Sequence, residues 1–159
     1  MTAFFKILVY GYGNPGREDD GLGAALVNRL EEWSKSSGYT GIEFDTNYQL
    51  NIEDAEAISG KDIVIFADAS TEEIDDYLFT EVTGETEVSF TTHAASPGYI
   101  VKLCRDLFGK CPKVYLLHIK GYQWDFKEGL SAGAENNLQN AFRFIKEYLI
   151  NLQTQHSRI

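Results

Sequence analysis

Residues 9–23 read Val-Tyr-Gly-Tyr-Gly-Asn-Pro-Gly-Arg-Glu-Asp-Asp-Gly-Leu-Gly, and this glycine-rich stretch decides how the chain folds. An apolar run directly before it favours a buried β-strand. Apolar residues recur at helical spacing over residues 22–30, which favours an amphipathic helix. We therefore predict a strand, a glycine-rich loop and a helix. Asp19 and Asp20 lie where the helix dipole favours negative charge.

The loop also fits the dinucleotide-binding pattern G-x-G-x-x-G through Gly11, Gly13 and Gly16. A bound pyrophosphate requires free backbone N–H groups at a helix N-terminus. The three carboxylates of residues 18–20 would repel it, and Pro15 removes one donor. We keep a nucleotide-binding domain using these glycines as an alternative, and we consider a cation better suited to this loop.

Length and charge narrow the possible classes of protein. The chain has 159 residues, of which 43% are hydrophobic, which is enough for one domain with one core. The formal net charge is −10 with no basic stripe, so neither nucleic acid nor an anionic membrane surface is an expected partner. The sequence contains no signal-peptide pattern and no apolar run long enough for a membrane span. We expect a cytoplasmic monomer.

Strands alternate with helices along the chain, which predicts an α/β fold: a single domain with a mostly parallel twisted sheet and helices on both faces. Residues 62–69 and 113–119 are continuous apolar runs, typical of parallel strands buried on both faces. We assign residues 1–152 to the domain and 153–159 to a polar C-terminal tail. The other predicted strands are 41–46, 78–82 and 88–90, the other predicted helices are 52–59, 97–108 and 132–152, and residues 122–126 are left as a strand or a loop.

Three polar side chains follow predicted strands, at the edge where open α/β sheets bind ligands. They are Asp20, Asp68 and His93. Two carboxylates and an imidazole suit a divalent transition metal with positions open for substrate or water. Each residue also has a structural alternative: Asp19 or Asp20 as a helix cap or first-turn residue, Asp68 as a turn cap, and His93 as an ordinary loop residue.

The remaining histidines and the cysteines have simpler interpretations. His118 lies in a strand predicted to be buried, which favours a packed, hydrogen-bonded imidazole, and His156 lies in the polar tail. Cys104 falls on the apolar face of a helix, and Cys111 precedes a proline with nothing to activate it. They form no C-x-x-C motif, so we expect reduced thiols rather than a disulfide framework.

The chain resembles the hydrogenase maturation proteases, the endopeptidases that trim the large subunit of nickel–iron hydrogenases. The resemblance covers most of the chain from residue 7 to about 150. The matching pieces are residues 11–14, 19–23, 65–69, 91–93 and 124–131.

This resemblance implies an aspartic-type endopeptidase that removes a C-terminal extension from a hydrogenase large-subunit precursor. It implies that Asp20, Asp68 and His93 are the catalytic residues and the nickel ligands, with nickel arriving on the precursor. The first ligand is either Glu or Asp in the family, and residues 15–18 depart from the more apolar residues common there. Whether Asp20 or Asp68 serves as a general base stays open. A non-catalytic, metal-sensing partner of the precursor is a further alternative.

Overall fold

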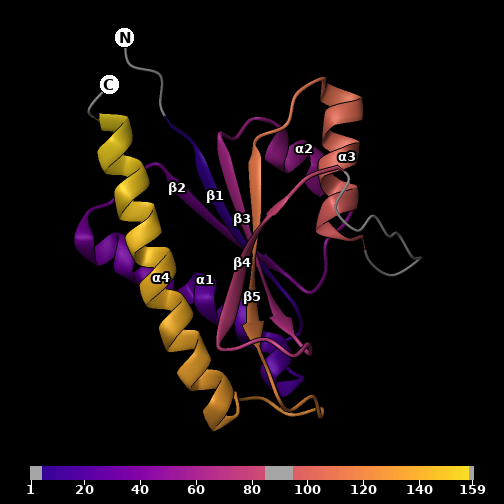
Figure 1. The fold of residues 1–159 in the computed structure, drawn as a ribbon, viewed down its shortest axis with the longest axis vertical. Helices are drawn as coiled ribbons and strands as arrows, with labels where there is room; N and C mark the ends of the chain where they lie inside the picture. The colour runs from indigo at the N-terminus through magenta and orange to yellow at the C-terminus, as the bar shows by residue number, and fades with distance from the viewer. Residues whose placement is uncertain (1–4, 85–94, 158–159) are drawn as a thin grey trace.

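A five-stranded sheet forms the middle layer of the computed structural model, which describes residues 5–84 and 95–157 (Figure 1). The elements are, in chain order, β1 (Ile7–Tyr12), the 3₁₀ helix η1 (Glu18–Gly21), α1 (Leu22–Ser37), β2 (Ile42–Asn47), α2 (Asp54–Ser59), β3 (Ile63–Ser70), β4 (Tyr77–Val82), α3 (Pro97–Phe108), β5 (Lys113–Lys120) and α4 (Ala132–Ser157). The strand order is β2-β1-β3-β5-β4, and only the pairing of β4 with β5 is antiparallel. The predicted α/β class and mostly parallel sheet are confirmed.

Helices cover both faces of the sheet, with α1 and α4 on one side and α2 and α3 on the other (Figure 1). Alternate side chains of the central strands β1 and β3 enter the two cores. Val9 and Ile65 pack toward α1 and α4, whereas Leu8 and Phe66 pack toward α2 and α3. Because both faces of these strands are buried, the strands are continuous apolar runs rather than alternating ones.

The parallel register brings the carboxyl ends of β1 and β3 to the same level. Gly11 of β1 is opposite Ala67 of β3, so the next residue of each strand, Tyr12 or Asp68, lies at the same edge. The side chain of Phe66 faces α2 and α3. Because side chains alternate along a strand, Asp68 lies on this face as well, and Tyr12 packs there too. The fold therefore places a hydroxyl and a carboxyl group side by side.

Two elements extend beyond their predicted ends. Asp68 was expected to follow its strand, but β3 continues to Ser70, because β5 still supplies ladder partners at these positions. Helix α4 continues to Ser157, into residues 153–159 that were predicted as a tail. Here the Gln153 side chain donates a 3.0 Å hydrogen bond to a backbone carbonyl before β2, which ties the last turns of the helix to the domain.

The segment of residues 122–126 forms a loop, which settles the choice left open by the sequence. The predicted strand at residues 88–90 and the residue His93 lie outside the described part of the chain. None of the helices within residues 5–84 and 95–157 combines the length and the hydropathy that a membrane span requires.

Close packing of α1 against the sheet explains two of the glycines in the opening stretch. A Cβ atom on Gly23 would lie 2.5 Å from the backbone oxygen of Ala67 and 2.8 Å from that of Tyr12. A Cβ atom on Gly11 would lie 2.2 Å from the backbone oxygen of Gly23. These glycines therefore permit contact between the helix and the strands.

The substitution Gly23→Ala tests this packing. Because the obstructing atoms are backbone atoms that cannot rotate away, we expect the free energy of unfolding to fall by about 3 kcal/mol in urea titrations followed by circular dichroism. Gly60→Ala is the matched control, because a Cβ atom there meets nothing within 4 Å. Equal effects of the two substitutions would contradict this account.

Candidate functional site

The backbone N–H groups of the glycine-rich loop are used within the protein. Asn14 donates to the Asp20 carboxylate at 2.8 Å, and Gly16 donates to the Asn14 side chain at 2.8 Å. Gly13 donates to a carbonyl of β2 at 3.0 Å, and Arg17 donates to the Asn14 carbonyl at 3.0 Å. These groups are not available to a pyrophosphate, which argues against nucleotide binding at this loop.

The Asp19 carboxylate is fully buried and joins the glycine-rich loop to the loop between β5 and α4. It accepts backbone hydrogen bonds from Tyr122 at 2.7 Å, Gln123 at 2.9 Å and Ser131 at 2.8 Å, and a fourth from the Ser131 hydroxyl at 2.7 Å. Burial by itself would raise the pKa of Asp19. The hydrogen bonds from Ser131, Tyr122 and Gln123 outweigh it, so the pKa lies below its ordinary value.

Neither aspartate caps α1, so the capping alternative for Asp19 or Asp20 does not hold there, although both lie in the first turn of η1. Gly21 is the N-cap of α1, with no side-chain capping bond, and both aspartates lie in η1. Asp19 instead acts at the start of α4, where the Ser131 hydroxyl that donates to it also accepts a hydrogen bond from Ala134 at 3.2 Å.

Further contacts between the same two loops hold η1 in place. Glu18 has a φ of 46°, and its N–H group donates to the Lys127 carbonyl at 2.8 Å. The Arg17 guanidinium donates to the Trp124 carbonyl at 3.1 Å and lies 5.0 Å from the centre of the Phe126 ring. The residues that precede Asp20 are therefore held by contacts with the loop after β5.

Asp20 lies at the end of this clamped segment and is partly buried. One carboxylate oxygen accepts the 2.8 Å hydrogen bond from Asn14. Gly13 has a φ of 131°, and a Cβ atom there would lie 2.2 Å from the Asp20 backbone oxygen. Only glycine allows the first loop residue to lie so close to the segment that carries Asp20.

Asp68 lies across from this segment, near the carboxyl end of β3. Its carboxyl group accepts hydrogen bonds from the Tyr12 hydroxyl and from the backbone of Ala69. Burial, followed by the charge of Asp20, raises the pKa of Asp68 to about 7. Burial and the charge of Asp68 also raise the pKa of Tyr12 well above its usual value, so its hydroxyl stays protonated and donates.

The interaction between Asp20 and Asp68 shows that the fold brings two of the three predicted site residues together. Two carboxylates in a partly buried place repel each other, and a cation or a shared proton relieves this repulsion. His93 lies outside the described residues. Within residues 5–84 and 95–157, no group of three metal-ligating side chains occurs.

His118 is a packed, hydrogen-bonded residue, as the sequence predicts. Its Nε2 atom lies 3.1 Å from the Thr80 hydroxyl of β4. Burial lowers the pKa of His118, and Glu72 partly opposes this effect. It is nevertheless opposite Asp68 in the β3–β5 ladder and therefore belongs to the surroundings of the site.

Sequence reasoning missed Tyr12. The sequence did contain a signal for it, because Tyr12 lies two positions after Tyr10 in the same strand and so shares its face.

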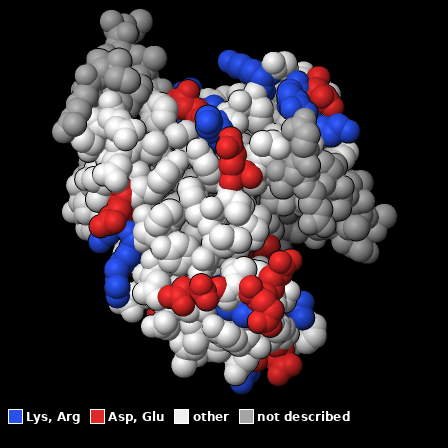
Figure 2. Space-filling view, viewed as in Figure 1, with Lys and Arg blue, Asp and Glu red and all other residues white. Residues whose placement is uncertain are grey.

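The charge distribution places the site at an acidic end of the molecule. In Figure 2, acidic side chains gather at the lower end of the view, toward which the parallel strands point in Figure 1.

Comparisons with known proteins place the chain by its fold. No protein-family model and no curated protein matches the sequence. Among solved structures, the chain shares its fold with hydrogenase maturation proteases.

One of these structures is the hydrogenase maturating endopeptidase HybD from E. coli, with 19% identity and a TM-score of 0.72 over 92% of this chain and 93% of that one. Another is the NiFe hydrogenase maturation protease HycI from Thermococcus kodakarensis KOD1, with 20% identity and a TM-score of 0.70 over 89% and 90%. A third is an uncharacterized protein from Wolinella succinogenes, with 24% identity and a TM-score of 0.62 over 93% and 99%.

Asp19→Asn tests the junction between the two loops. The amide would present a donor to a site that already contains four donors, so we expect a loss of about 3 kcal/mol in the free energy of unfolding. The neighbouring Asp20→Asn, which disturbs one recorded hydrogen bond, should cost about 1 kcal/mol or less. A smaller loss for Asp19→Asn than for Asp20→Asn in urea titrations would refute the junction.

Asp68→Asn tests the electrostatics of the site. Because the folded-state pKa of Asp68 is raised to about 7, ionising this group between about pH 4 and pH 7 weakens the folded state. The wild-type chain should lose stability as the pH rises through this window. Asp68→Asn should avoid that loss and melt about 2–5 °C higher above neutral pH, with little gain near pH 4. Thermal melts with Asp106→Asn, an exposed control on α3, check the difference.

Proposed function

We propose that this chain is an endopeptidase of the hydrogenase maturation protease family. It removes the C-terminal extension of a nickel–iron hydrogenase large-subunit precursor after nickel insertion. The observation that carries the proposal is the electrostatic interaction between Asp20 and Asp68 near the carboxyl ends of the parallel strands. The fold shared with HybD and HycI and the motif that contains His93 support it.

Asp20, Asp68 and His93 bind the nickel that the precursor carries on its cysteine thiolates. Carboxylate and imidazole ligands from this chain complete the thiolate set of the substrate at one ion. A precursor without nickel lacks the group that joins the two proteins, so the protease distinguishes loaded from empty substrate. The acidic lower end of the molecule suits a substrate that arrives with a cation.

The hydrogen bonds around the two carboxylates prepare them for this role. Asn14 holds one oxygen of Asp20, whereas Tyr12 and Ala69 hold the carboxyl group of Asp68. Side chains fixed in this way lose little freedom when they bind. Nickel supplies a Lewis acid for the peptide carbonyl, and an aspartate of the site accepts the proton of the attacking water. The aspartic type of the peptidase is part of this proposal.

We also propose an oligomeric state, a cell compartment and a basis for substrate choice. The chain works as a monomer in the cytoplasm, where its precursor substrate is made, and it binds neither nucleic acid nor membrane. The choice of substrate involves the loop of residues 15–18, because Pro15 lines two hollows of the surface.

A processing assay tests the function. Purified chain is incubated with nickel-loaded and nickel-free precursor, and cleavage is followed by the change in precursor mass. We expect cleavage of the loaded precursor only, and a rate at least about 100-fold lower for Asp20→Asn, Asp68→Asn and His93→Ala. Asp106→Asn, remote from the site on α3, should cleave at the wild-type rate.

Two results would overturn this proposal. A loaded precursor that binds the wild-type chain and stays full length would identify a non-catalytic metal-sensing partner. Normal processing by both Asp68→Asn and His93→Ala would leave an enzyme whose site is elsewhere. Circular dichroism of each variant separates a loss of chemistry from a loss of fold.

A further inference from the structure

The three consecutive acids of η1 differ in what their carboxylates contact. Asp19 accepts four hydrogen bonds, and Asp20 accepts one from a backbone N–H group. Glu18 is only 3% exposed, and its carboxylate forms no hydrogen bond or ion pair within the described part of the chain. A buried charge without a partner weakens the folded state, so the fold gains nothing from this carboxylate.

The chain nevertheless holds Glu18 in this place. Among the described residues other than glycine, only Glu18 has a positive φ, of 46°. This conformation is costly for a residue with a side chain and is typical of functional sites. The cation next to Glu18 in the sequence does not compensate its charge, because the Arg17 guanidinium contacts the Trp124 carbonyl and the Phe126 ring.

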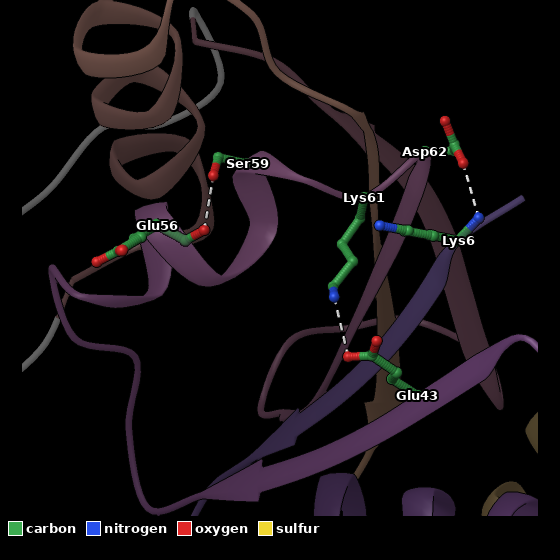
Figure 3. Close-up of polar contacts among 6 residues, drawn as sticks. All are labelled: Lys6, Glu43, Glu56, Ser59, Lys61 and Asp62. Atoms are coloured by element: carbon green, nitrogen blue, oxygen red, sulfur yellow. Dashed lines mark hydrogen bonds and ion pairs between the residues drawn. The ribbon is translucent and has the colours of Figure 1, made fainter. Parts of the chain in front are cut away.

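Carboxylates near the amino ends of the strands have partners although solvent reaches them. Figure 3 shows the Glu43 carboxylate beside the Lys61 ammonium group, at 2.9 Å. In the same view the Asp62 carboxylate accepts a hydrogen bond of 2.7 Å from the backbone N–H group of Lys6. These two acids are exposed and paired, whereas Glu18 is buried and unpaired. The fold therefore supplies partners to acids that need them less than Glu18 does.

Glu18 lines a hollow of about 180 Å³ between the glycine-rich loop, α1 and the start of α4. Asn28 of α1 is the other polar side chain that lines it, and none of its lining residues is basic. The apolar part of the lining comes from Pro15, Ala24, Ala25 and Leu130. A hollow with apolar walls and one unpaired acid suits a side chain that carries a cation on an aliphatic stem.

The hollow also lies beside the proposed catalytic residues. Gly21, which follows Asp20 directly, is one of its lining residues. A Cβ atom on Gly21 would lie 2.9 Å from the Cα atom of Pro15, so η1 and the glycine-rich loop touch at the hollow. An extended chain advances roughly 3.3–3.6 Å per residue. A substrate held at Asp20 can therefore place a side chain in the hollow from a position a few residues away.

We propose that this hollow binds a lysine or arginine side chain of the precursor, and that Glu18 forms an ion pair with it. Glu18 is then a residue that determines the specificity of the proposed peptidase, and this inference rests on the proposed function. The substrate supplies the partner that the fold does not, so the buried charge is compensated only in the complex. The net charge of −10 attracts a substrate segment that carries a cation.

Steady-state processing of the nickel-loaded precursor tests this pairing. Glu18→Gln keeps the shape of the side chain and removes its charge. We expect KM to rise about 10- to 100-fold with kcat unchanged, because the lost contact binds ground state and transition state alike. Glu32→Gln, at an exposed glutamate of α1, should leave KM unchanged. An unchanged KM for Glu18→Gln would overturn the proposal, whereas a wild-type chain that cleaves nothing would overturn the proposed function.

Precursor variants identify the basic residue. Each lysine and arginine within about five residues of the cleaved bond is changed singly to methionine, which keeps an unbranched apolar stem. One of these changes should raise KM for the wild-type chain as Glu18→Gln does, with no further effect on Glu18→Gln itself, because effects of residues in direct contact are not additive. Additive effects, or no effect of any basic residue, would contradict the ion pair.

Thermal melts separate a binding role of Glu18 from a structural one. Because neutralising an unpaired buried carboxylate removes the cost of burying its charge, Glu18→Gln should melt about 2–4 °C higher than the wild type near neutral pH. A lower melting temperature would mean that the fold itself uses the charge, and would count against the proposal.

A binding measurement decides the question without cleavage. The ¹⁵N-labelled chain is titrated with N-acetyl-arginine amide, N-acetyl-lysine amide or the uncharged N-acetyl-citrulline amide, and its backbone amide signals are followed by NMR. The two cationic compounds should shift the signals of Gly21, Ala25 and Gly129 with a Kd on the order of millimolar, and should leave Glu18→Gln unchanged. No shift at these residues, or equal shifts with the citrulline compound, would refute the cation site even if the chain is a peptidase.

Discussion

The buried carboxylate of Asp19 is the interaction on which the rest of the structure depends. One charged group is kept ionised by four hydrogen bonds, three from backbone N–H groups and one from a hydroxyl. Such an arrangement compensates the cost of burying a charge only if every donor is in place. It therefore fixes three parts of the chain at once: the glycine-rich loop, the loop after β5 and the first turn of α4.

The hydrogen bonds of Asp19 also position the next residue, Asp20. Asp20 follows Asp19 directly, so a rigid Asp19 sets where the Asp20 carboxylate lies relative to Asp68. The position of Asp68 is fixed separately, by the register in which β3 pairs with β1 and β5. The two acids meet because a loop and a sheet, each rigid for its own reason, end at the same edge. Burial and then the charge of Asp20 raise the pKa of Asp68, and the proposed nickel-bearing substrate would favour the ionised form of this group.

The parts of the fold that follow from local periodicity were predictable. The apolar runs of the central strands and the helical spacing after Leu22 are visible within short windows, and the parallel sheet follows from their alternation. Asp20 and Asp68 could be placed at one edge because each lies near or beyond the carboxyl end of a parallel strand. The role of Asp19 could not be predicted. It depends on distant donors that leave no periodic pattern in the sequence.

The donors that complete the Asp19 junction lie 103 to 112 residues further along the chain. A ribosome delivers the N-terminal half first, so the nascent glycine-rich loop emerges long before its partners exist. Until residues 122–131 have been synthesised, Asp19 stays hydrated and η1 lacks its clamp. The part of the site that carries Asp20 therefore reaches its final position only after residues 122–131 have been synthesised.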